Sequence, residues 1–482
     1  MRICIIAEGS YPYITGGVSS WIHSLMTNLP EFEFVIHSIG AHRQQQGQFK
    51  YTLPPNVIDV KETFLDEMLD EAGTSSRVRL DANQKEAFLS LLSGNEHVDW
   101  AGIFSLLRNE QFQRASDFLM SRDYFDVLTR LCEEKYSQIP FTEMVWTVRS
   151  MVLPLFSSVR EEIPQADLYH SVSTGYAGVI GALAKYLYNK PFLLTEHGIY
   201  SREREEEIIK ADWVKGYFKD LWIDYFYRLS GSAYDSADQV ITLFNRNREI
   251  EIELGCRPDK IAIIPNGVHL QNNQAEPAAV LPAAAPNVVR LGAIVRIVPI
   301  KDIKTMIHSF ALVKQQVPDA ELYIMGPADE NDEYHEECLQ LVDSLQVEGI
   351  TFTGEVRVAE YLPHMDLMLL SSVSEGMPLA VMEAMASSKP VVATDVGSCR
   401  ELLHGRDDGI GQAGEIVPVM HYEQMANAII QLCANRKLRE QMGKNGLERI
   451  RKHYMHDKFI ASYRELYSSM GGVEQWRASA SN

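Results

Sequence analysis

The chain has 482 residues, which is too long for a single hydrophobic core and predicts two or three domains. Hydrophobic residues make up 46% of it and charged residues 23%, a composition that excludes a disordered or fibrous protein. The formal net charge of -20 argues against nucleic-acid binding and against adsorption to an anionic membrane, so an anionic ligand must be bound by a few local cations.

The N-terminal residues and the cysteines predict a cytoplasmic protein. The first apolar run ends at Glu8, before it reaches the length of a signal peptide. No window approaches the ~20 apolar residues that span a bilayer, which predicts no direct membrane insertion. The six cysteines are scattered, as expected for reduced thiols rather than for a disulfide framework.

In the N-terminal half, short β-rich runs alternate with helical patterns, which indicates βαβ units and a parallel sheet. Between about residues 61 and 160 the apolar residues recur at helical spacing instead, so we expect a mostly helical insertion there. A first helix follows the glycine pair Gly16-Gly17. The expected strands are 2–7, 32–39, 168–172, 192–196, 239–243 and 260–265.

Residues 269–286 are rich in Ala, Pro and Gln, the composition of a linker, and mark the domain boundary. They separate an N-terminal domain over 1–268 from a second α/β domain over 287–452, which a helical segment follows over 453–482. The expected strands of the second domain are 288–295, 321–325, 350–353, 367–370, 391–394 and 415–417. One of the helices expected between them carries a single apolar stripe of Ile303, Met306, Ile307, Phe310 and Val313. The predicted fold class is therefore α/β, with two Rossmann-like doubly wound domains.

Two cations flank one strand-to-helix turn of the second domain. Ligands of open parallel sheets bind where the strands end, and Arg296 and Lys301 follow the strand over 288–295. Two cations at this place can bind a diphosphate, and the N-terminus of a helix capped by Asp302 adds positive potential. The alternative, two ordinary surface cations on a loop, is the commoner arrangement when these residues are considered alone.

Two glutamates lie near the next candidate turn. Glu375 follows the strand over 367–370, Pro378 suits the first turn of the helix after it, and Glu383 lies two turns into that helix. A carboxylate can accept hydrogen bonds from two hydroxyls of a ribose or a hexose. In the alternative interpretation, Glu375 only stabilises the start of the helix and Glu383 is an ordinary solvated charge on it. The apolar neighbours of Glu383 favour a functional role instead.

Other strand ends carry weaker candidates. Gly354 permits a close backbone approach to a base edge, although a glycine after a strand usually marks only a turn. His197 ends a strand with Arg202 and Arg204 close behind it, whereas a buried, hydrogen-bonded histidine is the commoner alternative. His170 is a second candidate with less support. Gly17 opens a helix and is a plausible phosphate or sugar contact, and Gly397 and Ser398 again end a strand before a short helix.

Several motifs are missing from the sequence. It contains neither a GxxxxGK[ST] loop nor an HExxH, and no DxD triplet lies at a strand end to bind a divalent metal. There is no GxSxG elbow, and Gly16-Gly17 is not part of a GxGxxG, which argues against a nicotinamide site. We therefore expect neither a metal nor a cofactor.

The order of motifs along the chain resembles the retaining GT-B glycosyltransferases of the glycosyltransferase family 4 type. The resemblance covers almost the whole chain apart from about residues 45–160. The exact residues of the motifs and the helical insertion resemble one branch, the PelF-type transferases of Pel exopolysaccharide biosynthesis. The segments that carry it are AEGSYPYITGGVSSW, TEHGIYSRER, IPNGV, VRIVPIKDIKT, FTGEV and SSVSEGMPLAVMEAMA.

This resemblance implies a cytoplasmic enzyme that binds a UDP-sugar in a cleft between its two domains and extends a polysaccharide acceptor. It also implies inner-membrane partner proteins and a C-terminal helix that returns to the N-terminal domain. The loop after Glu375 reads GMP where many members have GFG, so the residues that contact the sugar differ from the family pattern.

The resemblance also implies a role for each candidate residue. The catalytic residues are His197, which contacts the sugar, Glu375, and the pair Arg296 and Lys301, which bind the donor diphosphate. The other substrate-binding residues are Gly17 at the phosphate or acceptor, Gly354, Glu355 and Val356 at the base, Gly376, Met377, Pro378 and Leu379 at the sugar, and Glu383 at the ribose.

The implied mechanism is a transfer on one face of the sugar with retention of configuration. The cations stabilise the leaving diphosphate, which itself helps to deprotonate the acceptor hydroxyl, so no side-chain nucleophile is required. Two alternatives remain open: a nucleotide-sugar epimerase on the same fold, and a non-catalytic nucleotide-sugar-binding subunit of a polysaccharide synthase. The first requires acid-base residues around the sugar, and the second has no need of Glu375.

Overall fold

The computed structural model describes residues 1–66, 79–94, 97–110, 112, 115–270, 281–282, 285 and 287–471. The chain forms two compact units. Unit 1 contains residues Met1–Thr242, Asn247–Ile263 and the chain from Tyr463 onward, and unit 2 contains Leu243–Arg246 and Ile264–Ser462. Most of the expected linker over 269–286, and the chain after residue 471, lie outside the described residues.

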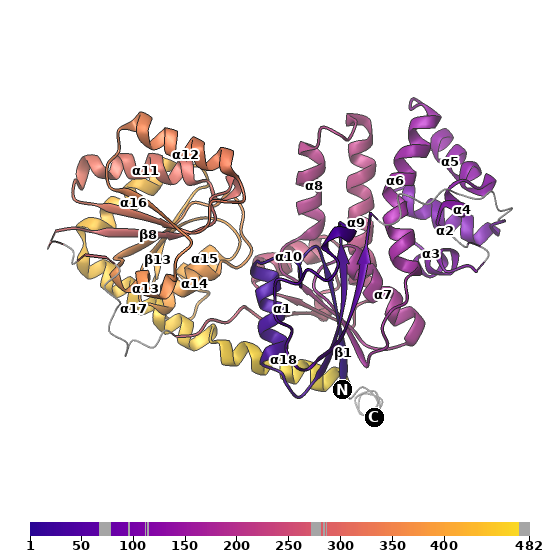
Figure 1. Ribbon diagram of the computed structural model, residues 1–482, viewed down its shortest axis with the longest axis horizontal. Coiled ribbons are helices and arrows are strands. Elements are labelled where there is room, and N and C mark those ends of the chain that lie inside the picture. The colour runs from indigo at the N-terminus through magenta and orange to yellow at the C-terminus, as the bar shows by residue number, and fades with distance from the viewer. Residues whose placement is uncertain are drawn as a thin grey trace. The chain divides into compact units, whose positions relative to one another are not determined.

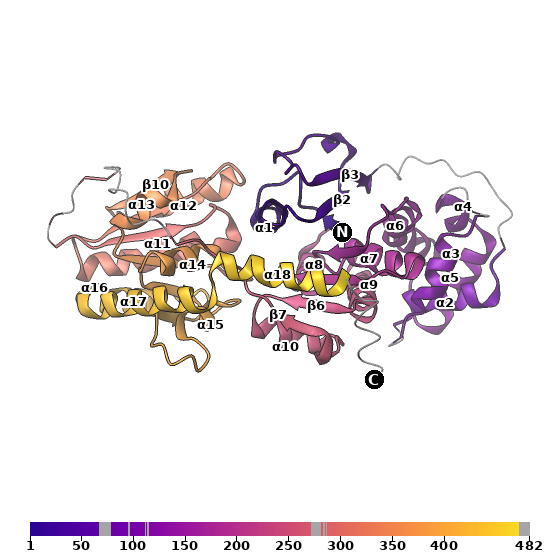
Figure 2. The ribbon, with the colours of Figure 1, turned by 90° about the horizontal axis from the view of Figure 1, so that it is seen from below.

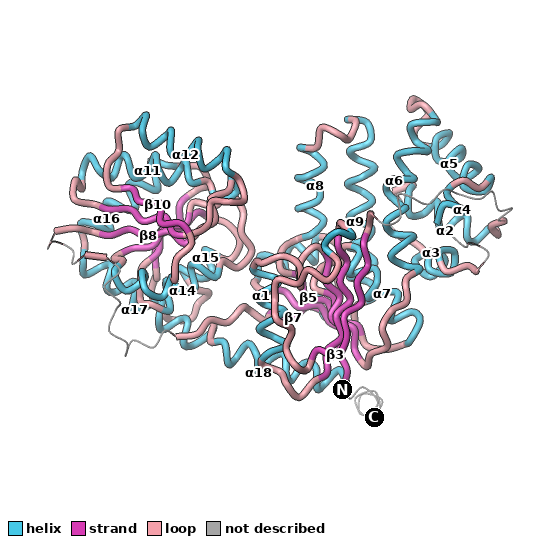
Figure 3. The backbone as a smooth tube through the Cα atoms, in the orientation of Figure 1, coloured by secondary structure: helices cyan, strands magenta, loops and turns pink. Residues whose placement is uncertain are grey.

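Unit 1 is built on a seven-stranded parallel sheet with the strand order β3-β2-β1-β4-β5-β6-β7. Figure 3 shows its strands in magenta. The order reverses between β1 and β4, as in a doubly wound fold. Its strands are β1 (Arg2–Glu8), β2 (Glu33–Gly40), β3 (Val57–Phe64), β4 (Leu168–Ser171), β5 (Phe192–Glu196), β6 (Gln239–Thr242) and β7 (Ile261–Ile263).

The strand β3 differs from the expectation. Residues 61–64 were expected to begin the helical insertion, but they pair in parallel with β2, with Glu62 opposite Ser38. The reason is that β3 lies at the edge of the sheet, where it is only partly buried and carries Asp59, Lys61 and Glu62 instead of an apolar run. The helical spacing seen from Phe64 therefore begins inside an edge strand.

Alternate side chains of β4 enter the layers on the two faces of this sheet. Tyr169 packs into the hydrophobic core beside α7, whereas His170 contacts Trp21 of α1 and Tyr463 of α18. Helices therefore cover both faces of the sheet (Figure 1). The helices of this sheet are α1 (Gly17–Thr27), α7 (Tyr176–Tyr188), α8 (Tyr200–Lys210), α9 (Lys219–Ser236), α10 (Asn245–Glu253) and α18 (His456–Gly471).

The connection from β3 to β4 contains the helical insertion. Figures 1 and 2 show α2–α5 grouped together beside the long helix α6, against which α3, α4 and α5 pack. Their apolar side chains continue the hydrophobic core of unit 1, so the insertion is part of this unit. The helices are α2 (Ala82–Leu92), α3 (Trp100–Leu107), α4 (Ala115–Leu119), α5 (Arg122–Glu134) and α6 (Phe141–Arg160).

Unit 2 is built on a six-stranded parallel sheet with the order β10-β9-β8-β11-β12-β13. The helices α11, α12 and α16 cover one face, and α14, α15 and α17 cover the other (Figure 1). The strands are β8 (Arg290–Ile294), β9 (Glu321–Met325), β10 (Ile350–Gly354), β11 (Leu367–Leu370), β12 (Val391–Thr394) and β13 (Gly414–Val417). The helices are α11 (Ile303–Gln316), α12 (Asp332–Leu345), α13 (Val358–Tyr361), α14 (Leu379–Ala386), α15 (Cys399–His404), α16 (Tyr422–Ala434) and α17 (Arg436–His453).

The start of α11 confirms two local predictions. Its expected apolar stripe is buried in the core of unit 2. Asp302 adopts a left-handed conformation with φ of 46° and caps the helix, because its Oδ1 accepts a hydrogen bond from the Thr305 amide at 3.2 Å. The cap ends the preceding turn η4 (Pro299–Lys301) and thereby places Lys301 at the helix start.

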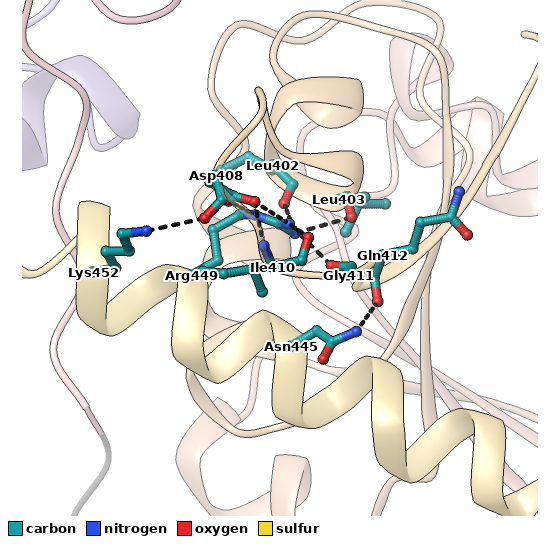
Figure 4. A network of polar contacts seen from close by, with 9 residues as sticks. All are labelled: Leu402, Leu403, Asp408, Ile410, Gly411, Gln412, Asn445, Arg449 and Lys452. Atoms are coloured by element: carbon teal, nitrogen blue, oxygen red, sulfur yellow. Dashed lines mark hydrogen bonds and ion pairs between the residues drawn. The ribbon is translucent and has the colours of Figure 1, made fainter.

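A buried arginine joins α17 to the loop between α15 and β13 (Figure 4). The side chain of Arg449 is 1% exposed and forms an ion pair with Asp408 at 2.7 Å. Its other guanidinium N–H groups donate to the carbonyls of Leu402, Leu403, Ile410 and Gly411. This charge is therefore paired and its donors are satisfied, as a buried arginine requires.

None of the described helices combines the length and the apolar composition that crossing a bilayer requires.

Candidate active site

The strand order of unit 2 reverses between β8 and β11, which pair in parallel at the centre of the sheet. In open α/β sheets, ligands bind beyond the carboxyl ends of the strands at such a switch point. The loop after β8 contains Arg296 and Lys301, and the loop after β11 contains Glu375. The topology therefore brings both expected segments to the same edge of the sheet.

Lys301 and Glu375 form an ion pair across these two loops. The distance from Lys301 Nζ to Glu375 Oε1 is 2.6 Å, and the side chains are only 17% and 12% exposed. Ser372 donates its hydroxyl to the same carboxylate oxygen at 2.6 Å. The hydroxyl of Ser371 donates to the Lys301 carbonyl at 2.8 Å, so the two loops are joined through backbone and side chain. The ammonium group is thus fixed in a site with little water, where its charge acts strongly.

The loop after Glu375 is packed closely against the next strand end. The amide of Ser398 donates to the Gly376 carbonyl at 2.9 Å. Gly397 has a φ of 50°, and a Cβ atom there would lie 2.1 Å from that same carbonyl oxygen, so only glycine fits. Met377 is buried, and Pro378 is the N-cap residue of α14, one position before the first turn in which it was expected. Leu379 begins the helix.

Glu383 lies on α14 between the buried residues Met382 and Ala384. Burial raises the pKa of its carboxyl above the ordinary range of glutamate. Within the described part of the chain, no hydrogen bond or ion pair reaches this carboxylate. It is therefore a largely desolvated acceptor, and a ligand with two neighbouring hydroxyls would satisfy it.

Arg296 is arranged differently from Lys301. Its guanidinium contacts both carboxylate oxygens of Glu330, at 3.0 Å and 2.7 Å, and both side chains are about half exposed. The structure thus places the two expected cations in the same loop, after β8, but pairs each with a different acid. Sequence spacing could not indicate Glu330, because it lies in the loop after another strand.

The expected base-binding segment lies at the end of β10. Gly354 is the last residue of this strand, has a φ of 69°, and faces open space where a Cβ atom would stand. Its carbonyl accepts a hydrogen bond from the Gly326 amide at 2.9 Å, which joins the ends of β9 and β10. Glu355 is exposed and Val356 is partly buried. This segment follows the strand next but one to β8, on the same edge of the sheet.

In unit 1, Gly17 and His197 both follow strands at the carboxyl edge of the sheet. Gly17 is the first residue of α1, and Trp21 follows one turn later on the same helix face. The ring of Trp21 contacts the His197 ring edge-on, with 4.7 Å between the centroids. Burial lowers the pKa of His197 to about 4, so its imidazole is neutral near pH 7, and its Nε2 atom has no hydrogen-bond partner among the described residues.

His170 has a structural environment instead. It is completely buried, its Nδ1 pairs with the Tyr467 hydroxyl at 2.7 Å, and its Nε2 pairs with the Thr195 hydroxyl at 2.8 Å. Both ring nitrogens are therefore satisfied, one by β5 and one by α18. Arg202 and Arg204, expected near His197, form ion pairs with Glu253 and Glu207.

A group of buried acids lies at the strand ends of unit 1, and sequence reasoning gave none of them a role. Glu8 at the end of β1 accepts hydrogen bonds from the Ala177 amide and the Tyr200 hydroxyl, and burial raises its pKa. Glu196 at the end of β5 accepts one from Tyr234 at 2.5 Å, and burial raises its pKa also. An acid that directly follows an apolar strand was the signal available, and it was present for both residues.

Glu251 on α10 is completely buried, and burial together with the neighbouring Glu196 raises its pKa. As the pH rises above about 4.3, the unfolded chain releases this proton while the folded chain keeps it, so stability is lost with rising pH. Glu251→Gln removes this titration. We compare the unfolding free energies of the variant and the wild type by urea denaturation. The variant's advantage over the wild type should be larger at pH 8 than at pH 5 by more than about 1.4 kcal/mol.

The matched control for this prediction is Glu253→Gln, on the same helix but exposed. It should leave the pH dependence of the unfolding free energy unchanged. Equal pH profiles for wild type and Glu251→Gln would contradict the raised pKa.

Among the described residues, no group of three or more His, Cys, Asp or Glu side chains is placed so that it could bind a metal ion.

Two family models match the chain. Residues 1–259 match a domain of unknown function, DUF3492, and residues 285–435 match the family described as glycosyl transferases group 1. The second match contains the loops of Arg296, Lys301 and Glu375.

Curated relatives agree with the second match. The chain is 31% identical over 173 residues to the N-acetyl-alpha-D-glucosaminyl L-malate synthase of Bacillus anthracis, a match that covers 35% of the chain and 42% of that protein. It is 24% identical over 418 residues to the UDP-Gal:alpha-D-GlcNAc-diphosphoundecaprenol alpha-1,3-galactosyltransferase of Escherichia coli, over 82% of the chain and 98% of that protein.

Solved structures share the fold. The sucrose-phosphate synthase of Thermosynechococcus elongatus superposes with a TM-score of 0.60 and 16% identity, over 97% of the chain and 98% of that structure. Anabaena HepE in complex with UDP gives a TM-score of 0.58 and 15% identity, over 97% of the chain and all of that structure. These likenesses confirm the expected GT-B fold of two Rossmann-like domains.

Proposed function

Because the chain belongs to the DUF3492 family and its residues 285–435 match the group 1 glycosyl transferases, we propose that it is a retaining glycosyltransferase. It transfers a hexose or an N-acetylhexosamine from a UDP-sugar to a growing exopolysaccharide. The observation that carries this proposal is the Lys301–Glu375 ion pair, which lies at the switch point of unit 2 with its serine partner Ser372.

The donor diphosphate is bound by Lys301 and Arg296. Charge develops on the leaving phosphate during transfer, and a cation already fixed beside it stabilises the transition state without reorganisation. Glu375 holds the ammonium of Lys301 in place, and with the backbone of residues 376–379 it lies near the sugar. The leaving phosphate then helps to deprotonate the acceptor hydroxyl, so the sugar keeps its configuration and no bound metal is needed.

The nucleoside is bound by two further segments. The desolvated carboxylate of Glu383 accepts hydrogen bonds from the ribose hydroxyls, and the segment Gly354–Val356 flanks the base. Uridine is favoured because the neighbour HepE binds UDP and because the Escherichia coli relative is named for a UDP-sugar. In unit 1, Gly17 and the neutral His197 serve the acceptor or the transferred sugar.

The amino-acid sequences of the motifs favour the PelF-type branch, in which a cytoplasmic transferase works with inner-membrane partner proteins. This assignment follows from the segments before the first helix, around His197 and around Glu375. It makes the acceptor a polysaccharide.

We expect UDP to raise the melting temperature of the protein more than GDP or ADP at equal concentration, because a ligand that binds only the native state stabilises it. Incubation of the protein and an oligosaccharide acceptor with UDP-glucose, UDP-galactose or their N-acetylated forms should transfer the sugar to an acceptor hydroxyl and release UDP. The NMR signal of the product's anomeric proton should then report retention. The same release should persist in EDTA. Binding of UDP without release would indicate a non-catalytic subunit, and formation of an epimer from the donor alone would indicate an epimerase.

A further inference from the structure

Unit 1 contains a hollow of about 360 Å³ between α6 and the segment that leads into α9. We call it the tryptophan groove. Its lining includes Thr142, Glu143, Trp146, Trp213, Lys215 and Trp222. A volume of this size is within the range of small-ligand sites, which combine apolar and aromatic walls with a few fixed polar groups.

Two of the indole rings in the tryptophan groove are unusually exposed. Trp213 is 69% exposed and Trp146 is 58% exposed, although a large aromatic side chain contributes most to stability when it is buried. Trp213 is nevertheless fixed, because it packs edge-on against the buried Trp222 at 5.4 Å and 85°. The groove thus presents aromatic faces in a defined orientation, which indicates a binding surface.

The polar side of the groove is also pre-arranged. Lys215 contacts a Glu143 carboxylate oxygen at 2.9 Å, and the Tyr217 hydroxyl donates to the other oxygen. These hydrogen bonds, that from Tyr217 first, lower the pKa of Glu143, so the acid stays ionised as an acceptor beside its cation. The charges of Glu143 and Lys215 offset each other, and the groove favours a neutral ligand that can both donate and accept hydrogen bonds.

The chemistry that fits both sides is a sugar ring. A pyranose has a flat face of C–H groups, whose slight positive charge suits the negative face of an indole, and a rim of hydroxyls for groups such as Glu143, Lys215 and Thr142. An apolar ligand would displace the water around the partly exposed Glu143 and Lys215 without replacing its hydrogen bonds. An anionic lipid surface would be repelled by a chain with a net charge of -20.

We propose that the tryptophan groove binds a segment of a neutral oligosaccharide. The choice of a glycan as ligand rests on the proposed transferase function, but the groove is formed by unit 1 alone and contains none of the residues assigned to the donor. A polymer bound at this second place is retained between transfer steps, because its rebinding to the enzyme becomes intramolecular.

The test is a titration of the full-length protein with cellohexaose, chitohexaose and maltohexaose, followed by tryptophan fluorescence and by the NMR signals of the indole N–H groups. At least one oligosaccharide should bind with a Kd at or below about 10 mM. Trp213→Ala should weaken that binding by about tenfold or more, the scale of a lost aromatic contact. Trp213→Phe, which keeps an aromatic face, should restore part of it.

The matched control is Tyr186→Ala, which removes an aromatic ring of unit 1 that is 50% exposed and lies outside the groove. It should bind the oligosaccharide as the wild type does. No binding of any of the three probes, or equal binding by wild type and Trp213→Ala, would overturn the proposal. Binding to phosphatidylcholine vesicles, or self-association that Trp213→Ala abolishes, with no oligosaccharide bound, would assign the groove to a membrane or to a second copy instead.

The melting-temperature shift of the wild type with UDP reports the donor site separately. If the protein binds the oligosaccharide but neither binds UDP nor releases it from a donor, the proposed transferase function is refuted and the proposal for the tryptophan groove stands. If it releases UDP but binds no oligosaccharide, only the proposal for the groove is refuted.

Discussion

Lys301→Ala is expected to lower the turnover of the transferase by at least about 10²-fold, the usual scale for removing one preorganised group that stabilises developing charge. The ammonium group is nearly buried beside Glu375, and in such a site its interaction with a leaving phosphate is screened little by water. The measurement is the rate of UDP release from a saturating UDP-sugar. Arg296→Ala should lower the rate on the same scale, because Arg296 is the second cation of the proposed diphosphate site.

The matched control is Lys304→Ala. Lys304 lies on the first turn of α11, only three residues from Lys301, but it is 40% exposed and pairs with the exposed Glu337. Its loss should change turnover little, since an exposed ion pair contributes little to a site. Melting temperatures of all variants separate a loss of catalysis from a loss of folding. Near-normal turnover in both Lys301→Ala and Arg296→Ala would refute the assignment of the diphosphate site.

Arg449→Met should destabilise unit 2 by about 3–5 kcal/mol, which is the cost of removing one partner of a buried ion pair. The substitution leaves the Asp408 carboxylate, only 9% exposed, without its cation, and it leaves the carbonyls of Leu402 and Ile410 without donors (Figure 4). Urea denaturation followed by circular dichroism should show a lower midpoint for the transition of this unit, by about 1 M or more.

Arg451→Met is the matched control, because Arg451 lies on the same helix two residues away but is exposed. It should change the unfolding free energy by less than about 0.5 kcal/mol. If the two methionine variants unfolded at the same urea concentration, the buried network of Arg449 would not contribute to the stability of the unit.

Much of the fold was predictable because buried parallel strands form short apolar runs. The bounds expected for β5, β9, β11 and β12 agree with the structure, since each run is continuous and ends at a polar residue or a turn. The edge strand β3 was not predictable in this way, because one side of it faces solvent and its charged residues interrupt the run. The Asp302 cap and the apolar stripe of α11 were both predicted, because each depends only on residues that are close together along the chain.

The residues of the candidate site could be named from the sequence, but the contacts among them could not be predicted. Lys301 and Glu375 were named separately, whereas their ion pair depends on β8 and β11 being neighbours in the sheet. The pairing of Arg296 with Glu330 depends in the same way on β9. The tryptophan groove joins residues about seventy positions apart, and no periodic pattern indicates that two distant indole rings remain exposed.

The helix α18 has a consequence for the synthesis of the protein. Tyr463 and Tyr467 belong to unit 1, where their hydroxyls pair with the buried Thr195 and His170. About 200 residues of chain, nearly all of unit 2, are translated between β7 and these tyrosines. At a ribosomal rate of roughly 5–20 residues per second, the first unit waits about 10–40 s for its last helix while its neighbour is being made. The N-terminal unit is therefore the first to begin folding and the last to be completed.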